Sequence, residues 1–377
     1  MGPVRPLRRG TAADGASGAC GHSRFPGATA DCAFHVGPGG GKTLAMHSSS
    51  SPSSSPSSSP SSSPSSSLSG LTPSLAAELG LADLHRHLDG SLRPSTVAEL
   101  AAARGVAVPA DLAFAPGMGL SAALSRFAFT LSLLRDPASV TRVASELCED
   151  AAAEGVTTLE IRFAPQLHVG AGIEAIIDAA LAGLDGRAGL ILCGLYGEPP
   201  GVLSSLVEAA ASRPGVVGID LAGGPGPTSV FGLTDYAPAF ARAADLGLGR
   251  TVHAGEGRPA QEIAEAIDLL QAQRIGHGTT LLDSPLVLDK VLKRRVLIEA
   301  CLTSNLHTGA IAALSAHPLP RWLTHGVAAC VCTDNTLLSA TDAPSELALA
   351  AALPGMTEAF LRQIIACGHR GAFVRRT

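Results

Sequence analysis

The sequence lacks an uninterrupted run of about 18 apolar residues, the length that a membrane-spanning helix needs. No apolar segment follows the Arg8-Arg9 pair, so an export signal is not expected. The eight cysteines show no CxxC spacing, which argues against a disulfide framework and a cysteine-rich zinc site. Cys330 and Cys332 alternate within an apolar stretch, which favours one face of a buried strand over half a metal site. These absences favour a cytoplasmic protein without a membrane span.

Charged side chains are also few, at 16% of the chain against 46% hydrophobic residues, so there is apolar material for a large core. The whole chain has a net charge of −5; residues 1–70, with five basic and two acidic side chains, contribute +3, which leaves −8 for the rest. A domain with this net negative charge repels the phosphate backbone of nucleic acids, so a nucleic-acid polymer is not an expected partner.

A low-complexity tract divides the chain. From Ser48 to Ser67 it consists of serine with a proline at every fourth position, which has nothing to bury. We therefore predict a disordered Ser/Pro-rich tail over residues 1–70 and one catalytic domain over residues 71–377. Met46 precedes the tract and is an alternative start, a hypothesis that the intact mass of the native protein tests. The segment Gly37–Thr43 is similar to a phosphate-binding loop, but its spacing is one residue short and no helix can follow it.

Eight short apolar or β-branched runs alternate with alanine- and leucine-rich stretches of helical periodicity. The predicted strands are Leu81–His87, Thr157–Phe163, Gly189–Leu195, Val216–Ala222, Arg250–Ala254, Arg274–His277, Val296–Cys301 and Ala328–Thr333. Predicted helices include Ser139–Ala153, Ile173–Leu184 and Pro259–Gln271. No glycine-rich dinucleotide turn follows the first strand, so the pattern favours a parallel (β/α)8 barrel over a doubly wound sheet.

The ends of these runs carry the groups that suit a metal centre. His85 and His87 are two apart on a strand, so both imidazoles point to the same side. His253 lies next to the end of the fifth run, His277 ends the sixth, and Asp334 follows the eighth. In a barrel all these strand ends meet at one face. Three imidazoles and a carboxylate suit Zn²⁺ with an open position for water.

In these residues the sequence resembles the adenosine deaminase family, which belongs to the wider group of amidohydrolase barrels. The resemblance runs in family order from about residue 80 nearly to the C-terminus. It rests on His85–Pro94, Leu159–Pro165, Asp220–Gly223, His253–Glu256, Arg274–Gly278, Thr303–Asn305 and Thr333–Asp334.

The resemblance implies one Zn²⁺ ion held by His85, His87, His253 and Asp334, which activates a water for hydrolysis. It also implies that His277 orients this water and accepts or stabilises its proton. Asp334 is expected to act in catalysis too.

The implied substrate contacts follow in the same way. Glu256 would be protonated and donate to purine N1. Gly223 would offer its backbone N–H to N3, and Asp89 would accept from the ribose 5′-hydroxyl, with His87 also beside the substrate. Phe127 and Phe129 lie where the family places an apolar lid, although a core role for them is equally open.

One position departs from the family. Asn335 stands where many members carry a second aspartate that hydrogen-bonds purine N7, and its amide can donate there without a raised pKa. The only lysines are Lys42, Lys290 and Lys293, so the carbamylated-lysine bridge of dinuclear amidohydrolases cannot be built near the fourth run. The H-x-E…P-C-x-x-C pattern of base-editing deaminases is missing as well.

The sequence therefore predicts a zinc-dependent hydrolase that deaminates adenosine and 2′-deoxyadenosine to inosine and 2′-deoxyinosine. An alternative is a deaminase of another 6-aminopurine compound, such as adenine, N6-methyl-AMP or aminodeoxyfutalosine. A non-catalytic nucleoside-binding protein is a further alternative, disfavoured because every implied ligand and the general acid are present. The oligomeric state stays open.

Overall fold

The computed structural model describes residues 68–374. The predicted tail lies almost wholly outside the described residues, as does Gly37–Thr43, so the division of the chain near residue 70 stays a prediction. Among the described residues, none of the helices has the length and apolar character that crossing a membrane requires.

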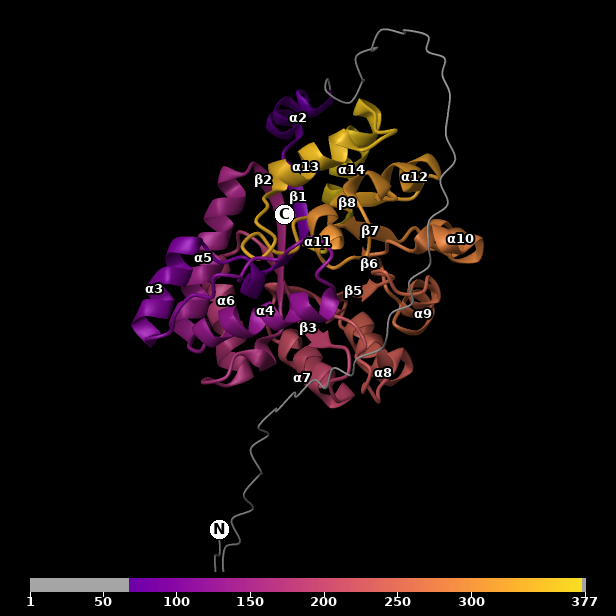
Figure 1. Cartoon of the computed structure of the whole chain (residues 1–377). Helices are drawn as coiled ribbons and strands as arrows, with labels where there is room; N and C mark the ends of the chain where they lie inside the picture. Colours follow the sequence, from indigo (N-terminus) through magenta and orange to yellow (C-terminus); the bar gives the residue numbers. More distant parts are fainter. Residues whose placement is uncertain (1–67, 375–377) are drawn as a thin grey trace, which may run out of the picture. The chain divides into compact units, whose positions relative to one another are not determined.

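Eight parallel strands form one sheet whose neighbours follow chain order (Figure 1). The strands are β1 Leu81–His87, β2 Val156–Phe163, β3 Gly189–Leu195, β4 Val216–Ala222, β5 Gly249–Ala254, β6 Arg274–His277, β7 Leu297–Ala300 and β8 Ala329–Val331. A backbone bridge between Arg86 and Asp334 joins the end of β1 to the segment after β8. The sheet thus closes on itself, and the predicted (β/α)8 barrel is confirmed.

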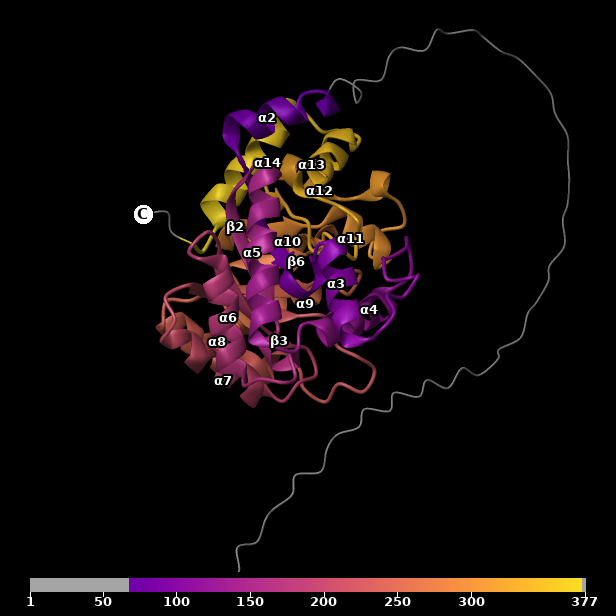
Figure 2. The same ribbon diagram turned by 90° about the vertical axis from the view of Figure 1, so that its left-hand side faces the viewer.

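Helices follow the strands and surround the barrel, as two perpendicular views show (Figures 1 and 2). They are α2 Thr72–Leu79, α3 Pro94–Arg104, α4 Leu120–Leu133, α5 Pro137–Ala153, α6 Ile173–Leu184, α7 Pro200–Ala211, α8 Leu233–Asp245, α9 Gln261–Leu269, α10 Pro285–Arg294, α11 Leu302–His307, α12 Leu319–Thr324, α13 Ala343–Ala352 and α14 Glu358–Gly371. The predicted helix from Ser139 begins two residues earlier. Pro137 fits the first turn, and Asp136 caps the helix by accepting from the Ser139 amide at 2.9 Å.

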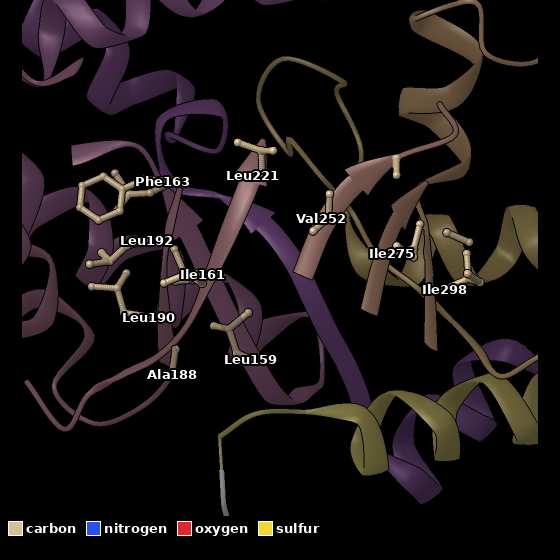
Figure 3. Close-up of a cluster of buried hydrophobic side chains, with 14 of the residues drawn as sticks. Leu159, Ile161, Phe163, Ala188, Leu190, Leu192, Leu221, Val252, Ile275 and Ile298 are labelled. Atoms are coloured by element: carbon tan, nitrogen blue, oxygen red, sulfur yellow. The ribbon is translucent and has the colours of Figure 1, made fainter. Parts of the chain in front are cut away.

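The strands place apolar and charged side chains on opposite sides. Leu159, Ile161 and Phe163 of β2 belong to the apolar cluster that includes residues of the surrounding helices (Figure 3). Glu160 and Arg162 alternate with them and are fully enclosed. Because successive strand residues point to opposite faces, β2 sends its apolar residues toward the helices and its charged ones into the barrel.

A column of ion pairs fills the barrel interior. Arg274 of β6 lies 2.6 Å from Glu160 through Nη1 and 2.7 Å from Glu299 of β7 through Nε. At the N-terminal end of the barrel, the backbone N–H of Phe373 donates to Glu160 at 2.5 Å, and the Phe373 ring lies 3.7 Å from the Arg274 guanidinium. Within this column, Glu299 lies nearest to the C-terminal ends of the strands, where the histidines are located.

Candidate active site

Four side chains converge at the C-terminal ends of the strands. Nε2 of His87 lies 3.4 Å from Nε2 of His253, and Oδ1 of Asp334 lies 3.4 Å from Nε2 of both His85 and His87. A tetrahedral Zn²⁺ with ligands at about 2.0–2.1 Å places neighbouring ligand atoms about 3.3 Å apart. These three separations, and the grouping of His85, His87 and His253 with ligand atoms within 4.8 Å of one another, are compatible with one ion held among the four side chains.

The protonation of His87 and Asp334 and a free ring nitrogen of His85 also fit a metal. Nε2 of His85 is enclosed and has no hydrogen-bond partner, an orphaned lone pair in the middle of the cluster. Burial lowers the pKa of His87 well below its usual range, which keeps that imidazole neutral. Burial opposes ionisation of Asp334, but the neighbouring His85 holds the pKa of this carboxyl well below its usual value. The described residues thus form a candidate metal centre of imidazole and carboxylate donors.

Two buried carboxylates orient two of the histidines. Nδ1 of His85 donates to Glu299 at 2.7 Å, and Nδ1 of His253 lies 3.1 Å from Asp220. Arg162 joins the two carboxylates, donating to Asp220 at 2.8 Å and to Glu299 at 2.9 Å. Such partners fix the tautomer of a ligating histidine and leave Nε2 free for the metal.

The cysteines near the cluster are thiols. The sulfur of Cys301 lies within 4.8 Å of ligand atoms of His85 and Asp334, and burial raises the pKa of its thiol well above the usual value. Cys330 and Cys332 are buried on one side of the chain, with sulfur atoms 3.6 Å apart, as the alternation predicts.

His277 and Glu256 stand beside the metal cluster. Nε2 of His277, the last residue of β6, lies 3.9 Å from Oε2 of Glu256. Nδ1 of His277 lies 2.9 Å from Nδ2 of Asn305, and Oε1 of Glu256 accepts from the Thr308 hydroxyl at 2.9 Å. Burial lowers the pKa of His277 to about 4, so the ring is neutral near pH 7. Oε2 of Glu256 also lies 3.9 Å from Nη1 of Arg258, and neither contact at 3.9 Å is a hydrogen bond that would withhold this oxygen or Nε2 of His277 from a ligand.

Two adjoining pockets open from the metal cluster. The smaller, with a volume of about 40 Å³, is lined by groups that include His253, Glu256, His277 and Asn335. The larger, of about 310 Å³, is mostly apolar and contains Asp89. The pockets share His87, Leu124, Phe127 and Gly223. The polar groups of the small pocket thus adjoin the metal cluster, and the larger apolar pocket continues from it past the shared residues.

Helix α4 forms one wall of both pockets. Phe127 lines them and its ring lies 6.2 Å from that of His87. Phe129, two residues further on, packs against the apolar core and lines neither pocket. Both phenylalanines thus pack against the apolar core, and of the two only Phe127 lines the pockets.

The remaining substrate candidates line the same space. Oδ1 of Asp89 is buried without a hydrogen-bond partner, and burial raises the pKa of this carboxyl to about 7. Gly223 has φ +77°, and a Cβ there would point into open pocket space, with Leu124 the nearest neighbour at 3.9 Å. A Cβ at Gly90 would lie 2.0 Å from Oδ1 of Asn335, so the glycine makes room for this amide.

Comparisons with known proteins point to one family. The family model described as adenosine deaminase matches residues 80–377. The chain belongs to the adenosine deaminase family. An adenosine deaminase from Serratia proteamaculans is 36% identical over 323 residues, which cover 79% of this chain and 95% of that protein. By this membership the protein is a hydrolytic deaminase.

Solved structures of the family have the same fold. An N6-mAMP deaminase from Arabidopsis is 28% identical, with a TM-score of 0.71, over 80% of this chain and 96% of its own. An amidohydrolase from Burkholderia ambifaria, solved with bound Zn, is 25% identical with a TM-score of 0.68, over 79% of this chain and 86% of its own.

Every predicted site residue lies in the metal cluster or lines the adjoining pockets. Lys290 of α10 pairs with Asp268 of α9, and Lys293 pairs with Asp289 within α10, away from the metal cluster. Lys42 is outside the described residues. Within the described chain no lysine is therefore placed to bridge two metals.

No role was predicted for Arg162, Glu299, Asn305 or Thr308, although Arg162 and Asn305 lie in segments on which the resemblance rests. A usable signal existed for the first two, because a charged residue within an otherwise apolar strand of a barrel points inward. The last two lie in α11 and the loop after it, and only tertiary contact connects them to His277 and Glu256.

Proposed function

We propose that the protein hydrolyses adenosine and 2′-deoxyadenosine to inosine and 2′-deoxyinosine with release of ammonia, using one Zn²⁺ ion per chain. The observation that carries the proposal is the junction of a small polar pocket beside the metal cluster with a larger apolar pocket that contains Asp89. The polar groups of the first would face the edge of a purine ring, and the second would take the sugar.

His85, His87, His253 and Asp334 would hold the ion. A zinc ion supplies Lewis acidity that makes water a nucleophile near neutral pH. His277 orients this water from one side, and Asp334 acts beside it. Glu256, with Oε1 occupied by Thr308, has Oε2 left to hold a proton toward purine N1, which makes C6 more electrophilic.

The other contacts orient the ring. The backbone N–H of Gly223 faces N3, where a side chain would take up pocket space. Asn335 donates its amide to N7. Its Oδ1 lies over Gly90, so Nδ2 is the end of the side chain that remains for a ligand.

The larger pocket favours a nucleoside over a nucleotide. Neither lysine nor arginine is among its described lining residues, and Asp89 stands where a 5′-phosphate would have to lie. A phosphate without a cationic partner is unfavourable there, whereas an unpartnered carboxyl oxygen accepts readily from a 5′-hydroxyl. This distinction disfavours N6-methyl-AMP, the substrate named for the Arabidopsis relative.

We further propose that the protein works in the cytoplasm. The six described cysteines are all free thiols, as expected in a reducing compartment.

A substrate panel followed by ultraviolet absorbance, with zinc measured on the same preparation, tests the function. Adenosine and 2′-deoxyadenosine should be turned over with a far higher kcat/KM than adenine, AMP, N6-methyl-AMP or aminodeoxyfutalosine. A preference for any of the last four would replace the proposed substrate, and absence of turnover in zinc-loaded protein would favour a non-catalytic binding protein.

A further inference from the structure

A chain of hydrogen bonds leads from the backbone of α12 to His277. The N–H of Leu319, the first residue of α12, lies 3.1 Å from Nδ1 of His317. Nε2 of His317 lies 3.3 Å from Oδ1 of Asn305, whose Nδ2 lies 2.9 Å from Nδ1 of His277. The three side chains are buried, so water does not compete for these bonds.

The backbone amide sets the direction of the whole chain. An N–H group only donates, so Nδ1 of His317 accepts, and the neutral ring carries its proton on Nε2. This Nε2–H donates to Oδ1 of Asn305, which turns the amide nitrogen toward His277. Nδ1 of His277 therefore accepts, and the neutral ring carries its proton on Nε2, the atom that faces Glu256 across the site.

The opposite direction is unfavourable at its fixed end. It would place a proton on Nδ1 of His317 against the N–H of Leu319, leaving two buried donors facing each other. Burial also lowers the pKa of His317 to about 3, which keeps the ring neutral, and the Trp322 ring packs edge-on against it at 5.5 Å. The tautomer of His317 is thus decided by a backbone atom far from any substrate.

We propose that Asn305 and His317 are positioning residues for deamination: anchored on the Leu319 amide, they hold the proton of His277 on Nε2. His277 then donates a hydrogen bond to the oxygen of the attacking water and stabilises negative charge that develops there. While this chain of hydrogen bonds is intact, His277 does not accept the proton of that water, which passes instead to the Asp334 carboxylate beside it. The inference rests on the proposed function, because the reaction supplies the oxygen that receives this bond.

Nitrogen-15 NMR of histidine-labelled, zinc-loaded protein tests the tautomer without any substrate. The signals of His277 are assigned by their loss in His277→Gln. In the wild type the nitrogen–proton correlations of the His277 ring should show a protonated Nε2 and an unprotonated Nδ1. In Asn305→Asp, the carboxylate accepts from both rings, so the proton of His277 should move to Nδ1.

Kinetics of the same variants give the second readout. Asn305→Asp and His317→Phe should lower kcat by about 10²-fold, as loss of one aligned donor does, with KM changed little. His317→Gln, whose amide nitrogen replaces Nε2, should recover much of the kcat lost in His317→Phe. The control is His369→Phe, which removes a histidine bonded to Thr158 and Gly80 at the opposite end of the barrel.

A wild-type signal with the proton on Nδ1 would overturn the inference, as would a tautomer unchanged in both Asn305→Asp and His317→Phe. Should Asn305→Asp fail to fold, the wild-type spectrum and His317→Phe still decide. The proposed function fails separately, through the substrate panel, because the tautomer is measured without a nucleoside.

Discussion

Glu299 accepts a hydrogen bond from Nδ1 of His85 at 2.7 Å, and both side chains are fully enclosed. The same carboxylate lies 2.7 Å from Arg274, whose other partner is Glu160. Two buried carboxylates thus share one arginine, but only Glu299 also contacts a metal-ligand histidine. The pair Glu299 and Glu160 offers a matched comparison.

We expect Glu299→Gln to weaken metal binding by about 10–100-fold, since outer partners of ligating histidines typically contribute that much. Glu160→Gln should lower stability but leave the metal affinity nearly unchanged. Competition with a chelator measures the affinity, and urea unfolding measures the stability. Equal losses of affinity in both variants would mean that general destabilisation, not orientation of His85, is responsible.

Purified protein should contain about one zinc per chain, because the four side chains converge on a single position. His253→Ala should lose zinc and activity together, whereas His369→Ala should keep both. Elemental analysis beside the activity assay provides the check. Two tightly bound ions per chain would contradict a mononuclear site.

Glu256→Gln should keep zinc and fold but lower kcat by about 10²–10⁴-fold, because the amide matches the acid in shape yet cannot hand over a proton. Single-turnover rates with adenosine, measured beside zinc content and thermal unfolding, separate the chemical step from binding. Turnover close to that of the wild type would remove Glu256 from the proposed mechanism.

The departure at Asn335 has a test of its own. If its amide donates to N7, 7-deaza-adenosine should be processed less efficiently, at a cost of about 1–3 kcal/mol for the unpaired buried donor. Asn335→Ala should erase this discrimination because the donor is then missing for both substrates, while Asn335→Asp should retain activity with an altered pH profile. Equal kcat/KM of wild type for adenosine and its 7-deaza analogue would refute the proposed ring orientation.

Glu346 should make stability depend on pH. It accepts from the amides of Leu302 and Thr303 at 3.0 and 3.3 Å, and burial raises its pKa from 4.5 to about 7. The folded protein therefore binds this proton more tightly than the unfolded chain does. The resulting stability is fully present below about pH 4.5 and is lost as the pH rises through about 7.

The free energy of unfolding, measured with urea at pH 5 and pH 8 in saturating zinc, checks this. The stability advantage of wild type over Glu346→Gln should shrink by about 2–3 kcal/mol between these two pH values. The control is Glu174→Gln, which changes an exposed carboxylate on α6 and should show no such trend. If the difference in unfolding free energy between wild type and Glu346→Gln were the same at both pH values, the raised pKa of Glu346 would be contradicted.

Much of this protein was predictable from local sequence. The strand periodicity located all eight strands to within one or two residues, because a barrel strand must be covered by helices on its outer face. The spacing of His85 and His87 places both imidazoles on one side of β1. Since the carboxyl ends of parallel strands meet at one face of a barrel, the order of the strands was enough to bring His253, His277 and Asp334 to them.

Only the tertiary structure decided which side chains contact and orient the histidines of the site. Glu299 meets His85 across 214 positions of sequence, and His317 reaches His277 only through Asn305. The closed barrel brings these side chains together in space. The local periodicity of the sequence does not contain the distances between them. The sequence alone therefore determined the barrel and the side chains at its mouth. The fold decided their tautomers and charges, because both depend on burial and on hydrogen bonds between residues far apart in the chain.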